Sequence, residues 1–80
     1  MYCDVKEVEA RENYLLALTF ADGEKKLFDM KPYLDLGVFK QLRDVNVFKS
    51  VRICFGSVAW DNDLDFDPEA LYDLGLPLKD

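Results

Sequence analysis

The sequence predicts an α+β domain over residues 1–80, in which helices pack on one side of a small antiparallel sheet. Three observations lead to this fold class. Half of the residues are hydrophobic, with six phenylalanines, four tyrosines and one tryptophan among them, which is typical of a packed core. Apolar residues alternate with period two in several short segments. Proline and glycine mark the ends of two helical segments, so the elements follow the order β-β-β-α-β-β-α.

Three strands are expected in the first part of the chain. Residues 2–9 mix polar and apolar side chains, as on a half-exposed sheet. Residues 14–20 give the strongest strand pattern, because every second residue is large and apolar. The Asp22–Gly23 pair favours a tight turn with positive φ, after which residues 25–30 return as the third strand.

A helical region is expected next. Pro32 suits the first turn of a short helix over residues 32–35, and a glycine separates this helix from a second helical segment over residues 38–43. The apolar residues of this region that are expected to pack against the core or its edge are Val38, Phe39, Leu42, Val47 and Phe48.

A β-hairpin is expected after the helical region. Its strands are residues 51–55 and 58–60, joined by Gly56–Ser57, a pair that suits a two-residue type II′ turn. The residues that alternation places on one face of the hairpin are Val51, Ile53 and Phe55.

The last helix has well-marked ends. Asp67 suits the N-cap position and Pro68 the first helical position. Leu71 and Leu74 give the helix an apolar stripe, and Gly75 is expected to end it.

The lack of histidine excludes whole classes of chemistry. Nucleophilic systems of the Ser-His-Asp or Cys-His type cannot form within this chain, and neither can a histidine pH switch. Cys3 and Cys54 are far apart and form no C-x-x-C motif, so neither a disulfide framework nor a zinc site is expected. Neither a signal peptide nor a membrane-spanning run is visible. We expect a cytoplasmic protein that is not an enzyme and has no cofactor.

Charge is distributed unevenly along the chain, whose net charge is −6. Residues 1–60 contain nine acidic and nine basic side chains, whereas residues 61–80 contain seven acidic side chains and a single basic one, Lys79. The segment 61–80, called here the acidic C-terminal quarter, repels phosphate backbones and attracts basic surfaces. We therefore expect a basic protein partner and no direct binding of nucleic acid or membrane.

Aspartates occupy every second position at the start of this segment. In a strand, Asp61, Asp63 and Asp65 point to one side while Leu64 and Phe66 point to the other. This arrangement is typical of an edge strand with its charges in water, where they also prevent unwanted strand pairing. The pattern therefore favours a solvated face, which also offers a docking surface.

Two chemical alternatives remain open for the same aspartates. The spacing matches the first half of an EF-hand calcium loop, but Phe66 stands where that loop needs glycine and Tyr72 stands where it needs a bidentate glutamate. Weak binding of a divalent ion by clustered oxygens stays possible on this pattern. Paired carboxylates also serve glycosidases, although no substrate pocket is evident in so short a sequence.

Trp60 precedes the aspartates and has two interpretations. Tryptophan is enriched among interface anchors, but it is also a common core residue at the end of a hairpin. The candidate residues for partner binding are Trp60, Asp61, Asp63, Asp65, Glu69, Tyr72 and Asp73.

Several segments, taken in order, are similar to those of one known family. They are the run from Tyr14 to Glu24 with its Phe-Ala-Asp-Gly-Glu end, Leu27-Phe-Asp-Met-Lys-Pro-Tyr-Leu34, Gly37-Val-Phe-Lys-Gln-Leu42, and Gly56 to Trp60 followed by Asp67-Pro-Glu69. On these segments the chain resembles the bacterial domain of unknown function 2442 over almost its whole length. One departure is the stretch Asp61-Asn62-Asp63, where relatives often have Pro-Asn-Gly.

The resemblance implies a compact α+β domain without assigned catalytic residues. It also implies a gene neighbourhood that looks like a toxin–antitoxin pair. Together with the charge distribution, it leads to the hypothesis of a small bacterial interaction protein, antitoxin-like, that docks a basic partner. A homodimer is a further expectation. The alternative hypothesis is a ligand- or metal-sensing regulatory module without catalytic activity.

Overall fold

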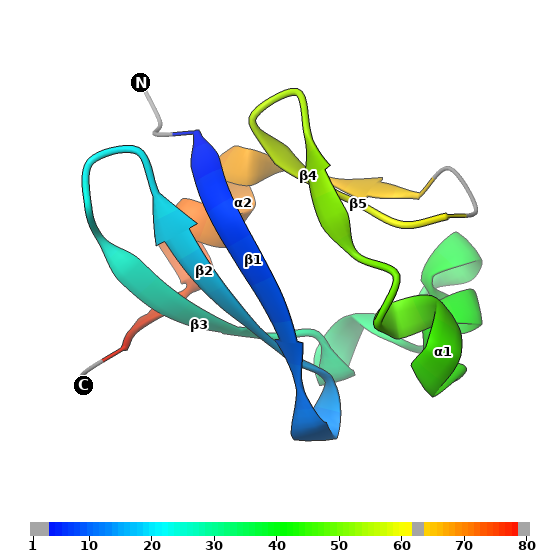
Figure 1. Cartoon of the computed structure of the whole chain (residues 1–80). Coiled ribbons are helices and arrows are strands. Elements are labelled where there is room, and N and C mark those ends of the chain that lie inside the picture. Colours follow the sequence, from blue (N-terminus) through cyan, green and yellow to red (C-terminus); the bar gives the residue numbers. More distant parts are fainter. Residues whose placement is uncertain (1–3, 62–63, 79–80) are drawn as a thin grey trace.

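The chain folds into two antiparallel sheets connected by short helices in the computed structural model, which describes residues 4–61 and 64–78 (Figure 1). The first sheet has the order β1-β2-β3-β7, and the second has the order β4-β5-β6. The strands are β1 (Val5–Arg11), β2 (Leu15–Phe20), β3 (Lys25–Asp29), β4 (Arg52–Cys54), β5 (Ser57–Ala59), β6 (Asp65–Phe66) and β7 (Leu76–Pro77). The predicted α+β class is confirmed, although the strands form two sheets instead of one.

Alternation in β2 gives the first sheet two different faces. Leu16, Leu18 and Phe20 are buried in the core, whereas the side chains between them are half-buried on the opposite face. In Figure 1, α2 (Pro68–Leu74) lies on one side of this sheet, and no described helix covers the other side. The first sheet therefore has a covered inner face and an open outer face.

Turn residues connect the first three strands. The Asp22–Gly23 turn is confirmed: Gly23 has a φ of 90°, and the Glu24 amide donates to Asp22 Oδ1 at 3.0 Å. The first strand extends past its predicted end at residue 9 to Arg11. The 3₁₀ turn η1 (Glu12–Tyr14) follows, so Tyr14 lies just before β2 and not in it.

The predicted helices in the middle of the chain are mainly 3₁₀ helices. They are η2 (Lys31–Tyr33), η3 (Gly37–Arg43) and the short α1 (Val45–Phe48). Leu42 and Phe48 are buried and Phe39 is half-buried, as expected. The prediction for Val38 was wrong, since its side chain is 57% exposed. A 3₁₀ helix has three residues per turn, so it does not keep the apolar face of an α-helix.

The last helix begins as predicted but packs differently. The Asp67 side chain accepts a hydrogen bond from the Glu69 amide at 3.0 Å and so caps α2. Leu71 is fully buried, but Leu74 is 60% exposed, which contradicts its expected place in the core. The reason is that the last turn of α2 leaves the core, so that the chain can pass through Gly75 into the edge strand β7.

Gly75 is required by close packing and not by its backbone angles. Its φ is −67°, which any residue adopts. A Cβ atom there would lie 2.7 Å from the Leu71 carbonyl oxygen and 3.1 Å from Lys26 Cβ. Glycine therefore allows the chain to turn from α2 directly into β7, where Leu76 pairs with Leu27.

The core lies between the two sheets, and Trp60 is the largest side chain that is fully buried within it. The Trp60 indole Nε1 donates to the Phe48 carbonyl oxygen at 3.0 Å, and its amide donates to the Leu64 carbonyl oxygen at 2.8 Å. Both N–H donors of this residue are thus satisfied inside the core. The tryptophan connects β5 with α1 and with the segment that enters β6.

Replacing Trp60 with phenylalanine is expected to lower the free energy of unfolding by about 2 kcal/mol, because the change removes buried ring volume and the indole N–H that donates to the Phe48 carbonyl oxygen. That oxygen would keep only the longer hydrogen bond from the Val51 amide, at 3.4 Å. Urea denaturation followed by circular dichroism measures the loss. Phe55→Leu alters an aromatic side chain that is fully exposed and is the matched control, with an expected change below about 0.5 kcal/mol. Equal losses in the two variants would contradict the placement of Trp60 in the core.

Candidate functional site

The acidic C-terminal quarter presents its charges to solvent. Asp61, Asp65, Glu69 and Asp73 are all exposed, and they lie after β5, on β6 and on α2. Asp63 lies outside the described residues. On β6, Asp65 points outward while the neighbouring apolar residues point inward, Leu64 being buried and Phe66 half-buried. The predicted alternation thus holds where the structure describes it.

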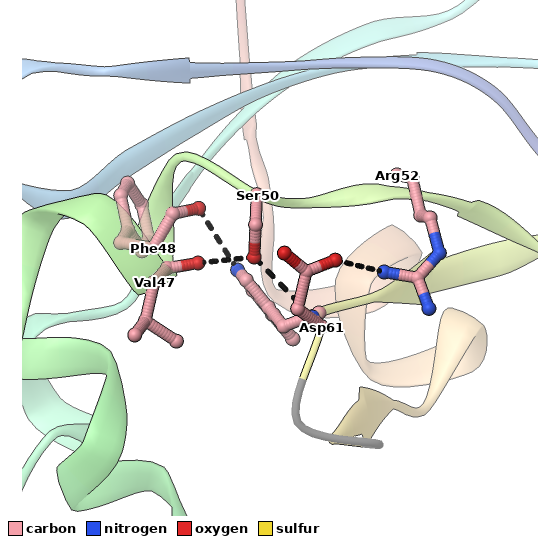
Figure 2. A network of polar contacts seen from close by, with 6 residues as sticks. Val47, Phe48, Ser50, Arg52 and Asp61 are labelled. Carbon is pink, nitrogen blue, oxygen red and sulfur yellow. Dashed lines mark hydrogen bonds and ion pairs between the residues drawn. The ribbon is translucent and has the colours of Figure 1, made fainter.

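Asp61 is held in place by a small polar network (Figure 2). Its carboxylate accepts a hydrogen bond from Arg52 Nη1 at 3.0 Å, and its amide donates to Ser50 Oγ at 3.2 Å. Ser50 Oγ in turn donates to the Val47 carbonyl oxygen at 2.6 Å. Because Arg52 neutralises part of its charge, Asp61 contributes less to the acidic surface than its exposure suggests.

Trp60 is not available to a partner. Its side chain has no exposed surface, and its indole N–H is already bonded to Phe48. The interpretation of Trp60 as an interface anchor is therefore replaced by the core interpretation. The physical reason is that the position shares the inward face of β5 with the fully buried Val58.

Tyr72 is half-buried and connects α2 to the first sheet. Its hydroxyl donates to Asp22 Oδ2 at 2.8 Å, and its ring packs edge-on against Phe20 with the centroids 4.9 Å apart. Lys26 Nζ lies 3.8 Å from the centroid of the Tyr72 ring and also donates to the Tyr72 carbonyl oxygen. These contacts give Tyr72 a structural role, with only part of its surface left for a partner.

Phe55 is the exposed aromatic residue that the sequence did not point to. It lies at the tip of the β4–β5 hairpin and is fully exposed. Beside it is an open hollow of about 400 Å³ whose lining includes Asp65, Phe66 and Asp67. An apolar ring and two carboxylates of the acidic quarter therefore meet at one place on the surface.

The hairpin turn explains the position of Phe55. Cys54 pairs with Ser57, so the two loop residues are Phe55 and Gly56, and their φ angles are 50° and 78°. Positive φ at both central positions defines a type I′ turn. The predicted Gly56–Ser57 turn was displaced by one residue, and Phe55 does not continue the strand face of Val51 as expected. The sequence did contain a signal for the observed turn, since Gly56 occupies its second central position and glycine is typical there in a type I′ turn.

The arrangement around Phe55 suits a cationic side chain of a protein partner. Lysine and arginine bind carboxylates through charge-assisted hydrogen bonds and bind aromatic rings through cation–π contacts. Within residues 4–61 and 64–78, the structure contains no group of three or more side chains placed to hold a metal ion. The helices of the same residues are too short to cross a membrane.

Comparison with known proteins gives one finding. The model of the family described as "Protein of unknown function (DUF2442)" matches residues 5–76. Neither the curated proteins nor the solved structures contain a significant match.

Replacing Phe55 with asparagine is expected to raise the free energy of unfolding by about 0.5–1 kcal/mol, because asparagine tolerates positive φ and an Asn–Gly pair favours the type I′ turn. Chemical denaturation measures the gain. Phe55→Ala is the control, because alanine also removes the exposed ring but does not favour positive φ. If asparagine stabilises the protein no more than alanine does, the turn assignment is contradicted.

Proposed function

This chain belongs to the DUF2442 family, and we propose that it is a bacterial, cytoplasmic interaction protein without catalytic activity that docks a basic protein partner. The observation that carries the proposal is the segregation of charge, with seven acidic side chains and one basic side chain in residues 61–80. A surface of one sign raises the association rate of an oppositely charged partner by long-range attraction.

The fold supports this proposal by keeping the acidic side chains outside. The carboxylate of Asp65 is directed outward because its neighbours Leu64 and Phe66 enter the core side of β6. Asp67 caps α2 at the same site, and Glu69 follows in the exposed first turn of that helix. Capping uses one oxygen of Asp67 for the Glu69 amide, and a carboxylate has further lone pairs to offer.

Phe55 takes the role of anchor in this proposal. Most of the binding energy at protein interfaces comes from a few residues, and aromatic side chains are enriched among them. Phe55 is exposed although its φ of 50° is unfavourable for a residue with a Cβ atom, and within the chain the ring contributes no burial in return. A local conflict of this kind is more readily explained by binding than by folding.

The kind of partner follows from the resemblance and the charge together. The resemblance implies a gene neighbourhood that looks like a toxin–antitoxin pair, and on this expectation we propose an antitoxin-like subunit whose partner is the product of the adjacent gene. In this role the acidic surface would cover a basic surface of that product. The hollow beside Phe55 would receive a lysine or arginine side chain from it.

A groove elsewhere in the structure favours a second candidate function, a ligand-sensing module. The groove has a volume of about 930 Å³ and lies between the β1–β2 hairpin and α1, with Tyr14, Leu15, Phe48 and Lys49 in its lining. A thermal-shift screen with metabolites and divalent ions tests it, since a ligand at 100 times its Kd adds about 2.7 kcal/mol of stability. No shift in the screen would count against this candidate.

Neutralising the acidic surface is expected to slow association with the adjacent gene's product. The variant Asp65→Asn with Glu69→Gln should lower the association rate constant by roughly three- to tenfold at low salt, and the difference should shrink as salt screens the charges. Stopped-flow or surface plasmon resonance measurements at several salt concentrations give the rates.

The matched control removes two exposed charges elsewhere, through Glu12→Gln with Glu24→Gln. These residues lie in the loops at the two ends of β2, outside the acidic quarter. Equal slowing by both pairs, or association that does not depend on salt, would contradict docking by the acidic quarter. If the chain does not bind the adjacent gene's product at all, the proposed antitoxin-like function is overturned.

The variant Phe55→Asn separates binding from folding. We expect it to raise the dissociation rate constant of the complex by about tenfold, because an anchor side chain acts mainly on dissociation. The same change is expected to stabilise the free protein, so weaker binding cannot be attributed to unfolding. An unchanged dissociation rate would show that Phe55 lies outside the interface.

A further inference from the structure

The outer face of the first sheet has an apolar centre. Residues that pair directly across antiparallel strands lie on the same face, so the pairs of Ala17 with Glu9 and with Leu27 place all three on the side opposite the core. The same register adds Leu15 and Thr19 to this face, and all the β2 side chains there are half-buried. A shallow hollow of about 230 Å³ lies over the short side chains of Ala17 and Thr19.

Four charged residues of alternating sign surround this centre. Arg11 and Asp29 flank Leu15 at one end of β2, while Glu7 and Lys25 flank Thr19 at its other end. At each end of β2, one flanking residue is therefore acidic and the other is basic. The basic residue is on β1 at the Leu15 end and on β3 at the Thr19 end. Arg11 also pairs with Glu9 in the same chain, at 2.9 Å, and exposed pairs of this kind contribute little to stability.

We propose that this outer face packs against the same face of a second copy of the chain. A two-fold axis between the two faces, parallel to β2, places β1 over β3 of the second copy and keeps each position of β2 over its own equivalent. Arg11 then lies over Asp29 of the second copy, and Glu7 lies over Lys25 of the second copy. Symmetry forms each of these contacts twice.

The alternating signs favour a second copy over a different partner. A foreign basic or acidic surface would meet two charges of its own sign among these four residues, whereas the two-fold rotation pairs each of the four with an opposite charge. An axis perpendicular to β2 would place Glu9 over Glu9 of the second copy. The axis parallel to β2 instead places Glu9 over Leu27, so it avoids that repulsion.

The dimer is expected to be weak. The three strands β1, β2 and β3, about 4.8 Å apart and about six residues long, give roughly 300 Å² of face in projection. A standard protein interface buries about 800 Å² on each partner. Short side chains at Ala17 and Thr19 let the two sheets approach closely, which favours packing over that limited area. We expect a Kd on the order of 10–100 µM.

Sedimentation equilibrium of the whole chain across that concentration range tests the proposal. Glu7→Lys places like charges over each other and should raise the dimer Kd by about tenfold or more. Adding Lys25→Glu to this variant restores opposite signs and should bring the Kd back to within about threefold of the original value. Lys40→Glu reverses one exposed charge in η3, away from the outer face, and should leave the Kd unchanged.

The outcomes separate clearly. A chain that stays monomeric at all these concentrations overturns the proposal, and so does a Glu7→Lys variant that dimerises as well as the original chain. If the double variant has lost its native circular dichroism spectrum, Arg11→Glu with and without Asp29→Arg repeats the exchange at the other end of β2. A folded double variant that stays as weak as its single parent overturns the proposed pairing.

Discussion

The burial of Trp60 is the constraint on which the arrangement of this surface depends. Its indole N–H is bonded to the carbonyl oxygen of Phe48, and its amide is bonded to the carbonyl oxygen of Leu64. These two bonds fix α1 and the start of β6 relative to the hairpin. With Leu64 drawn into the core, the next residue, Asp65, must face the solvent. Of the two interpretations of Trp60, the core residue is therefore the correct one, and it acts by orienting the acidic residue that follows Leu64.

Local chemistry allowed much of the fold to be predicted from the sequence. The Asp22–Gly23 turn and the Asp67 cap each depend on a side chain and a backbone within a few residues, so their signals are complete in the sequence. The alternation of large apolar residues in β2 likewise identifies the inner face of the sheet, and it does so whatever element covers that face. These features placed the first three strands and the last helix correctly to within a few residues.

Contacts between distant residues explain what could not be predicted. The strand β7 exists because Gly75 lets the chain approach Lys26 closely, and no local pattern announces that pairing. The register of the second hairpin is fixed in part by Ser57, whose hydroxyl donates to the carbonyl oxygen of Phe66. A shift of one residue moved Phe55 from a strand to the tip of a turn, and the most exposed aromatic side chain of the candidate site was therefore missed.

The two proposed contacts use different distributions of charge, and this difference follows from electrostatics. A surface of one sign cannot pack against its own copy, because every two-fold rotation brings like charges together. The acidic quarter is therefore suited to a foreign, basic partner and unsuited to self-association. The first 60 residues carry equal numbers of acidic and basic side chains, and on the outer face of the first sheet these alternate around an apolar centre. Such a face favours its own copy. Under both proposals, a dimer formed through the first sheet leaves Phe55 and Asp65 of β6 free, so each dimer has two sites for the partner.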